Sequence, residues 1–247
     1  MNSAHWPYPR WVAHRGAGKL APENTLAAFV LGAQHGYRMF ECDVKLSQDG
    51  VPFLMHDAEL ERTTNGKGVA GNLPWSDLAR LDAGGWHSRR YTGEPLPSLE
   101  NIARFCLANG HALNIEIKPS PGTGALTGTT VANHAARLWQ SAEVPPLLTS
   151  FDPQALQAAQ QAQPDLPRGL LLHTAAQGWI TIAQQLGCVA IVCNHVLWDT
   201  NTVAAAKAAG MRCLSYTVND VPTAERLLAL ATDGIITDRV DLFVPVR

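Results

Sequence analysis

The chain has 247 residues, of which 46% are hydrophobic and 16% charged, and its formal net charge at pH 7 is −2. This composition is typical of a globular protein and excludes a disordered or fibrous one. The near-neutral charge and the lack of a basic run argue against nucleic acid as a partner. No apolar run approaches the ~18 residues that a membrane span needs, so we expect no stable membrane association.

The first ten residues and the cysteines bear on the cellular compartment. Met1 to Arg10 is a polar stretch with prolines and aromatic residues, and it lacks the apolar core of a secretory signal. The five cysteines are scattered without a CxxC pair, which predicts buried thiols in a reducing compartment and not disulfides or zinc ligands. We therefore expect a cytoplasmic protein. The cysteines are Cys42, Cys106, Cys188, Cys193 and Cys213.

Short apolar runs alternate along the chain with amphipathic stretches. The runs predict eight strands, near 11–14, 39–45, 113–117, 146–150, 169–172, 189–193, 213–218 and 234–237. The stretches between them predict helices near 24–35, 98–109, 127–141, 152–162, 177–186, 200–209 and 221–231. Apolar strands that alternate with helices indicate a parallel sheet covered by helices. Eight such strands in a chain of this length favour an α/β fold of the TIM (β/α)8 barrel type.

One segment departs from this alternation. The turn signal Asp49-Gly50 is followed by an apolar return strand over 51–55, and residues 57–97 are rich in Gly, Asn and Trp with little helical periodicity. Long irregular segments of this kind are commonly functional. We predict a small insertion subdomain over about 51–97, placed after the second barrel strand and over the barrel mouth. The barrel then occupies 10–50 and 98–247, and residues 1–247 form a single domain.

Barrel enzymes build their sites at the carboxyl ends of the strands, and several polar side chains occur there. They are His14, Arg15, Glu41, Asp43, His56, Glu116 and Lys118. Alternate residues of a strand share a face, so Glu41 and Asp43 project together, as do Glu116 and Lys118.

Three carboxylates that converge in a barrel repel one another unless a cation lies among them. Oxygen ligands suit Mg²⁺, Ca²⁺ or Mn²⁺ better than zinc. The alternative is an ion network in which the carboxylates pair with Arg15 and Lys118.

Arg15 and Lys118 beside such a cation predict a site for a phosphoryl group. His14 and His56 titrate near neutral pH and can supply the base and the acid that a phosphodiester needs. Our working order takes His14 as the base and His56 as the acid.

The remaining aromatic and histidine side chains give weaker signals. Phe151 and Tyr216 follow or end later strands and could shape the pocket, while Trp75 and Trp86 are candidates for a groove wall in the insertion. His195 follows a strand and could line the mouth. We expect the other histidines to be ordinary core or surface residues, namely His5, His35, His87, His111, His134 and His173.

In chain order, the motifs are similar to those of the glycerophosphodiester phosphodiesterase family. They are His14-Arg15-Gly16, Pro22-Glu23-Asn24-Thr25, Glu41-Cys42-Asp43, His56-Asp57, Pro97-Ser98-Leu99-Glu100, Glu116-Ile117-Lys118, Ser150-Phe151, Thr217-Val218-Asn219 and Asp233-Gly234-Ile235-Ile236-Thr237-Asp238. The resemblance covers residues 11 to 241. The chain length and the start Trp6-Pro7-Tyr8-Pro9-Arg10 resemble the cytosolic bacterial enzyme of this family that is associated with glycerol-3-phosphate uptake.

The resemblance implies a TIM barrel with an insertion and hydrolysis of glycerophosphodiesters, such as glycerophosphocholine and glycerophosphoethanolamine, to sn-glycerol 3-phosphate and an alcohol. It implies one divalent cation, held by Glu41, Asp43 and Glu116. It also implies that His14 and His56 are the acid–base pair and that Arg15 and Lys118 hold the phosphate. Many relatives have Trp where this chain has Tyr216, so the contacts on the glycerol side differ. The expected partner is a small-molecule substrate, and a monomer and a homodimer both remain open.

Two alternative functions can be distinguished from this family assignment. A phospholipase-type diesterase that acts on intact lipids would need an exposed apolar rim or a membrane-binding stretch, and the sequence shows neither. A catalytically silent barrel that only binds a phosphorylated ligand would lack at least one of the histidines or carboxylates.

Overall fold

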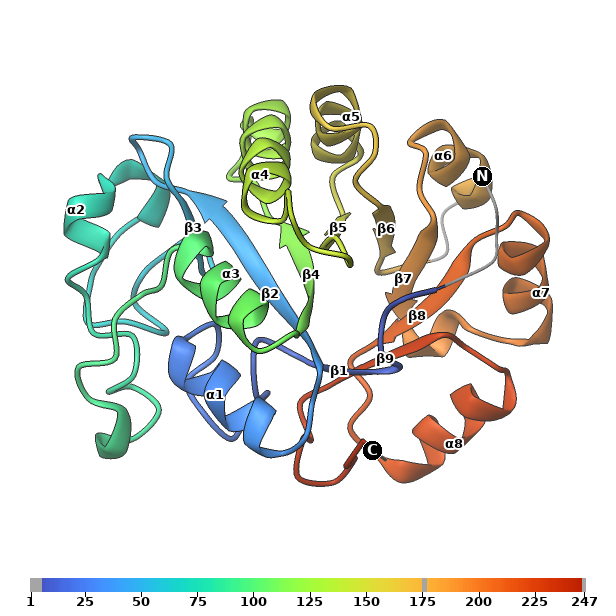
Figure 1. The fold of residues 1–247 in the computed structure, drawn as a ribbon, viewed down its shortest axis with the longest axis horizontal. Coiled ribbons are helices and arrows are strands. Elements are labelled where there is room, and N and C mark those ends of the chain that lie inside the picture. The colour runs from blue at the N-terminus through green and yellow to red at the C-terminus, as the bar shows by residue number, and fades with distance from the viewer. Residues whose placement is uncertain (1–5, 175–176, 246–247) are drawn as a thin grey trace.

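The computed structural model describes residues 6–174 and 177–245, and within them one sheet closes into a barrel (Figure 1). The sheet order is β1-β9-β8-β7-β6-β5-β4-β2-β3, and an added pairing between β1 and β2 closes the ring. Every barrel pairing is parallel, while β3 pairs antiparallel with β2 outside the ring. The strands are β1 (Trp11–Ala13), β2 (Met39–Leu46), β3 (Pro52–Leu54), β4 (Ala112–Ile117), β5 (Leu147–Ser150), β6 (Arg168–Leu172), β7 (Ala190–Asn194), β8 (Arg212–Tyr216) and β9 (Gly234–Thr237).

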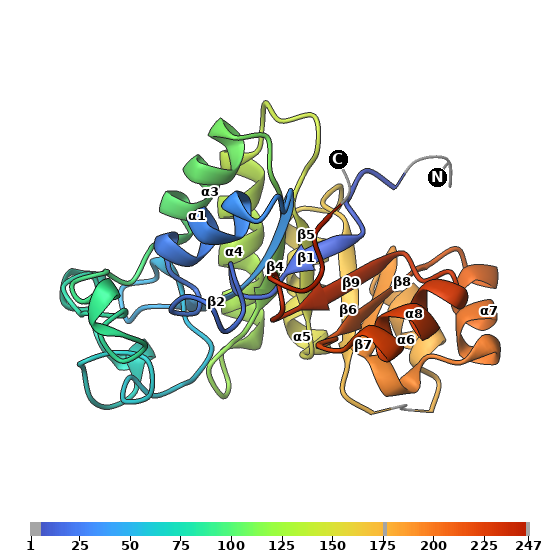
Figure 2. The same cartoon turned by 90° about the horizontal axis from the view of Figure 1, so that it is seen from below.

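Helices connect the strands and cover the outside of the barrel (Figure 2). They are α1 (Leu26–Gln34), α2 (Trp75–Leu78), α3 (Leu99–Ala108), α4 (Gly124–Leu138), α5 (Pro153–Ala162), α6 (Trp179–Gln185), α7 (Thr200–Ala208) and α8 (Val221–Ala229). Ser, Thr or Asp side chains accept the first free backbone N–H at five of these helices, which fixes where each begins. The predicted (β/α)8 barrel is confirmed. The largest shift is in α4, which begins three residues before the predicted 127.

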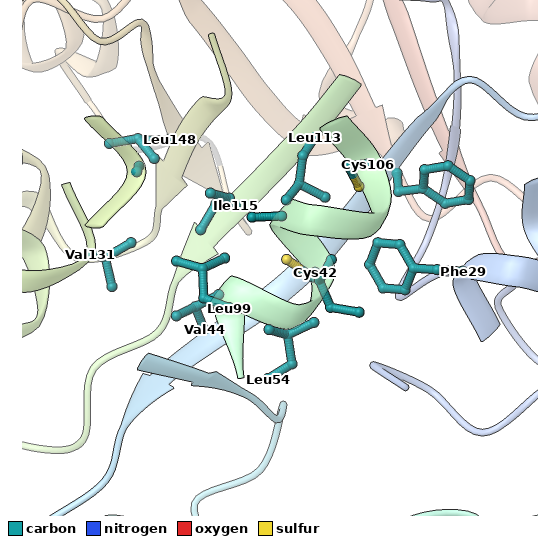
Figure 3. Packing of buried hydrophobic residues seen from close by; sticks show 14 of the residues in the cluster. Phe29, Cys42, Val44, Leu54, Leu99, Cys106, Leu113, Ile115, Val131 and Leu148 are labelled. Carbon is teal, nitrogen blue, oxygen red and sulfur yellow. The ribbon is translucent and has the colours of Figure 1, made fainter. Parts of the chain in front are cut away.

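The helix-facing sides of the strands form the main core (Figure 3). Cys42 and Val44 of β2 and Ile115 of β4 pack with Phe29 of α1 and Leu99 of α3. All five side chains are fully buried. Each large apolar side chain buried in this way contributes about 1.5–3 kcal/mol to folding. The core therefore fixes β2 and β4 against α1 and α3, and these two strands carry the carboxylates.

The opposite faces of the same strands point into the barrel, and their character changes along the strand. Near the start of β2, Met39 packs with Val12 and Ile236 in a buried apolar cluster. Glu41 and Asp43 follow at the next two inward positions, because successive inward residues are two apart. The interior is thus apolar at one end and acidic toward the carboxyl ends of the strands.

Residues 51–97 lie between β2 and α3. This segment contains β3, α2 and two short 3-10 turns, Ala70–Asn72 and Arg89–Tyr91. It has its own apolar cluster, which includes Phe53, Leu60 and Leu78. In both views it lies at the end of the molecule next to α1 and α3, with α7 at the opposite end (Figure 1, Figure 2). No helix in the described ranges has the length and apolar character that a membrane crossing requires.

Candidate active site

Three buried carboxylates meet at the carboxyl ends of β2 and β4. Glu41, Asp43 and Glu116 each place one oxygen within 4.8 Å of the others, and the strand register puts Asp43 beside Glu116. Their exposures are 4%, 1% and 9%. Burial and the charge of Asp43 raise the pKa of Glu41 to about 8 and also raise the pKa of Glu116. The site therefore holds more negative charge than its surroundings balance.

Two cationic side chains approach this cluster. Arg15 Nε lies 3.1 Å from Asp43 Oδ2, and Lys118 Nζ lies 3.2 Å from Asp43 Oδ1 and 2.8 Å from Glu116 Oε1. Burial would raise the pKa of Asp43, but Arg15 and Lys118 outweigh it and hold that pKa well below its usual range. The ion network that the sequence left as an alternative is thus present around Asp43.

The network leaves the negative charge of Glu41 without a close cationic partner. Glu41 Oε2 accepts the backbone N–H of Arg15 at 3.1 Å, and its one described ion pair is with His14 Nε2 at 3.8 Å. Three hard oxygen donors in a buried cluster with surplus negative charge fit a divalent cation such as Mg²⁺, Ca²⁺ or Mn²⁺. The donor set therefore suits the expected metal, and the network around Asp43 does not replace it.

His14 is held by Asp238, which directly follows β9, and Asp238 is in turn held by Asn219 from the loop after β8. Nδ1 of His14 lies 2.6 Å from Asp238 Oδ1, and Asn219 donates to Asp238 Oδ2 at 3.0 Å. Burial lowers the pKa of His14, but the Asp238 hydrogen bond and the charge of Glu41 outweigh it, so the net shift is upward. Gly18 allows this contact: it has φ +58°, and a Cβ there would lie 2.2 Å from the Asp238 backbone.

His56 approaches the site from the return strand. Its Nδ1 lies 2.7 Å from Asp57 Oδ1. Burial is the main cause of a lowered pKa at His56, and the Asp57 hydrogen bond opposes it only in part. Both histidines therefore have an aspartate on Nδ1, which fixes the ring orientation and leaves Nε2 for other partners.

These groups surround one cavity of about 180 Å³. His14, Arg15, Glu41, His56, Glu116 and Lys118 line it, together with Asn114, Thr149, Phe151, Leu171, His173, Tyr216, Thr217 and Ile236. The rings of Phe151 and Tyr216 meet edge to face at 5.8 Å, and the Tyr216 hydroxyl donates to the carbonyl of Leu172. Asp43 lies behind the lining residues, against Arg15 and Lys118.

Some expectations from the sequence need correction. His173, expected to be an ordinary core or surface residue, lines the cavity because it follows directly on β6. His195 is not among the lining residues and lies in a short turn after β7. Trp75 packs on Phe53, and Trp86 donates to a backbone carbonyl within the insertion. Neither lines this cavity, and a groove within the insertion stays a prediction. His5 lies outside the described residues.

The sequence also missed several side chains that hold the site together. Asn24 donates to Asp43 Oδ2 at 2.8 Å, and the next residue, Thr25, caps α1. Asp57 and Asp238 orient the histidines, and Glu23 joins Arg15 to Arg62. Asp238 directly follows the last strand, so the strand-end rule could have found it. Arg62 lies in irregular chain and gave no signal.

The fold and the site together define the class of protein. A (β/α)8 barrel with buried carboxylates, two cationic side chains and two aspartate-held histidines at the carboxyl ends of its strands is suited to phosphodiester hydrolysis.

Comparison with known proteins identifies the family. Residues 14–242 match the Glycerophosphoryl diester phosphodiesterase family. The chain belongs to this family, and it is a glycerophosphodiester phosphodiesterase by class, as the sequence motifs predicted.

Similar structures and sequences extend over almost the whole chain. A phosphodiesterase from Oleispira antarctica, solved with the product sn-glycerol-3-phosphate, is 32% identical with a TM-score of 0.87 and covers 94% of this chain and 93% of its own. A glycerophosphodiester phosphodiesterase from Agrobacterium tumefaciens is 30% identical with a TM-score of 0.81, covering 96% and 99%. The glycerophosphodiester phosphodiesterase of Caldanaerobacter subterraneus is 29% identical, covering 92% and 93%.

Proposed function

We propose that this enzyme hydrolyses small glycerophosphodiesters, such as glycerophosphocholine and glycerophosphoethanolamine, to sn-glycerol 3-phosphate and an alcohol, with the help of one divalent cation. The carrying observation is that one cavity is lined by Arg15, Lys118, His14, His56 and two of the three clustered carboxylates, while Asp43 lies behind this lining. The Oleispira antarctica relative supports the product, because its structure contains sn-glycerol-3-phosphate.

Glu41, Asp43 and Glu116 would hold the cation. When bound, it supplies positive charge that stabilises the charge developing on the phosphate oxygens. Arg15 and Lys118 supply further positive charge at the same point. Burial lowers their pKa values, but the charge of Asp43 outweighs it, so the net shift is upward and both stay charged. Arg15, Lys118 and the cation would therefore bind and orient the phosphate.

The two histidines exchange protons with the substrate. His14 Nε2 lies on the carboxylate side of the cavity, 3.8 Å from Glu41, and His56 comes from the return strand. A base and an acid on different sides of a phosphate can serve the attacking and the departing oxygen. We assign His14 to the attacking side and His56 to the departing alcohol.

The aromatic wall of Phe151 and Tyr216 shapes the rest of the cavity. The Tyr216 ring, whose hydroxyl donates to the Leu172 carbonyl, and the half-exposed Phe151 ring can pack against the carbons of the glycerol or of the alcohol.

The insertion contacts the β1–α1 loop beside this site. We therefore propose that residues 51–97 and the barrel act as one catalytic domain.

The test is release of sn-glycerol 3-phosphate from a panel of glycerophosphodiesters. We expect activity that EDTA abolishes and that Mg²⁺, Ca²⁺ or Mn²⁺ restores. The His14→Ala and His56→Ala variants provide the controls for contaminating activity. Turnover that is indifferent to chelation, or a wild-type rate in either variant, would refute the proposal.

A further inference from the structure

Arg62 of the insertion forms four hydrogen bonds with two carboxylates from different parts of the chain. Its Nε and Nη2 donate to Asp57 Oδ2 and Oδ1 at 2.5 and 3.0 Å, and its Nη1 and Nη2 donate to Glu23 Oε2 and Oε1 at 2.8 Å each. The planar guanidinium thus binds both carboxylates in a fork, a geometry that the point charge of lysine cannot reproduce.

Each of these carboxylates also contacts a residue that lines the cavity. Asp57 Oδ1 lies 2.7 Å from Nδ1 of His56, and Glu23 Oε1 accepts Nη1 of Arg15 at 2.8 Å. Arg15 Nε in turn lies 3.1 Å from Asp43. A continuous path of polar contacts therefore runs from the insertion to both sides of the site.

We infer that Arg62 is a positioning residue for the reaction, which fixes the His56 ring through Asp57 and the Arg15 guanidinium through Glu23. This inference rests on the roles proposed above for His56 and Arg15. It gives the insertion a part in the reaction beyond His56, because Arg62 is supplied by residues 51–97 and reaches Glu23 and Arg15 in the loop after β1.

The hydrogen bond between Asp57 and His56 explains how the loss of Arg62 would change the protonation of the His56 ring. An ionised Asp57 can only accept hydrogen bonds, so His56 must carry a proton on Nδ1 to keep this contact. The neutral ring then presents Nε2 without a proton, and the charged ring presents it as an acid. Without Arg62, Asp57 loses two donors and is free to turn away, and the ring can adopt either tautomer.

Arg62 is not the sole attachment of the insertion to the barrel. Glu94 accepts the backbone N–H of Ala27 at the start of α1, and His87 Nε2 contacts the carbonyl of Lys19 at 3.0 Å. The strand β3 of the insertion also pairs antiparallel with β2 of the barrel. The side chain of Arg62 is also 44% exposed, and ion pairs at exposed positions stabilise a fold by only ~0–1 kcal/mol. Loss of Arg62 should therefore leave the fold intact.

The experiment compares Arg62→Ala and Arg62→Lys with the matched control Arg80→Ala. Arg80 also belongs to the insertion, but within the described structure its hydrogen bonds go to Asp77, at 2.8 Å, and to the carbonyl of Ser76, and neither residue lines the cavity. We expect Arg62→Ala to lower kcat by about 10- to 100-fold, the usual effect of removing a group that orients a site residue. Its melting temperature should fall no further than that of Arg80→Ala.

Two further measurements separate positioning from folding. Low millimolar guanidinium should restore part of the activity of Arg62→Ala, while Arg62→Lys should remain impaired. In the metal-free protein, ¹⁵N NMR of labelled histidine should show His56 protonated on Nδ1 in the wild type and a mixture of tautomers in Arg62→Ala.

The outcomes distinguish this inference from the proposed function. If His56→Ala is inactive but Arg62→Ala matches Arg80→Ala in kcat and in the His56 spectrum, the role of Arg62 is refuted and the proposed function stands. If the melting temperature of Arg62→Ala falls so far that the loss of folded protein accounts for the loss of activity, Arg62 is merely structural and the inference fails. If His56→Ala keeps the wild-type rate, the proposed function fails, and the NMR comparison still tests whether Arg62 orients the ring.

Discussion

Asp238 Oδ1 lies 2.6 Å from Nδ1 of His14, although 224 positions separate the two residues in the chain. The contact exists because the barrel closes: β9 pairs with β1, and Thr237 is the register partner of Ala13. We expect Asp238→Asn to lower kcat by about 10- to 100-fold with little change in KM, because an amide can present a donor as well as an acceptor to Nδ1 and no longer fixes the tautomer of His14. Steady-state kinetics check this.

The control for this variant is Asp233→Asn. Asp233 lies just before β9 and pairs with Arg212 at 3.0 Å, away from His14. Equal effects of the two variants on kcat would show that the loss comes from a disturbed β9 and not from His14.

The roles of the two histidines can be separated by the leaving group. A 4-nitrophenyl phosphodiester releases a stable phenolate that needs no proton. A variant that lacks only the general acid should therefore regain activity on this substrate. We expect His56→Ala to recover at least about tenfold relative to glycerophosphocholine, whereas His14→Ala stays at ~10²- to 10⁴-fold below the wild type. Recovery of His14→Ala in place of His56→Ala would exchange the two assignments.

Divalent cations should stabilise the folded enzyme through the carboxylate cluster. A ligand at 100 times its Kd adds ~2.7 kcal/mol to the free energy of unfolding, which for a chain of this size raises Tm by about 5 to 10 °C. We expect Mg²⁺, Ca²⁺ or Mn²⁺ to produce this shift in the EDTA-treated wild type but not in Glu116→Gln, as measured by thermal unfolding. Asp77→Asn, which removes an exposed carboxylate of the insertion, should respond like the wild type. A full shift in Glu116→Gln would contradict the cluster as the metal site.

Glu23 should make the stability of the enzyme sensitive to acid. Burial raises the pKa of Glu23, but Arg62 and Arg15 outweigh it and hold that pKa below its ordinary value of 4.5. Because the folded pKa is depressed, the stabilisation is present above pH 4.5 and is lost as the pH falls through the folded pKa. We expect Glu23→Gln to lower the free energy of unfolding by about 2 kcal/mol at pH 7. The difference should shrink in urea titrations toward pH 3, and a difference that stays constant from pH 7 to 3 would argue against this pair.

Phe151 should contribute to substrate binding more than to chemistry. Its ring meets Tyr216 edge to face at the cavity wall, and a phenyl group can neither donate nor accept a proton. An aromatic contact of this kind is worth about 0.5–1.5 kcal/mol, so we expect Phe151→Ala to raise KM by about two- to tenfold with kcat nearly unchanged. A fall in kcat alone would place Phe151 in the positioning of the reacting groups.

Local patterns predicted most of the fold. Each barrel strand is a short apolar run, and polar caps mark several helix starts, so element type and order follow from neighbouring residues. The start of α4 was misplaced because Thr123 and Gly124 read as loop residues, and no side-chain cap marks the helix start. The insertion has little periodicity, so its internal structure could not be predicted.

The site residues, like the fold, could be predicted only where local patterns determine their positions. Strand ends and alternation brought Glu41, Asp43 and Glu116 together in the prediction, because strand geometry alone sets those positions. Strand ends could place Asp238 at this edge of the barrel, but the pairing of each histidine with its aspartate could not be found by this reasoning. Asp238 meets His14 only through barrel closure, and Arg62 reaches Glu23 from an irregular segment 39 positions later in the chain.

The cavity draws on the two halves of the chain unequally. Its carboxylates, its cationic side chains and the pair His14 and His56 come from residues 14–118, while the loops that follow β5, β6 and β8 supply Phe151, His173 and Thr217 to the wall. Exchange of these later loops would alter the wall and leave the phosphate-binding groups in place. New alcohol preferences are therefore accessible by recombination within the second half of the gene, and directed evolution of this enzyme can confine its libraries to that half.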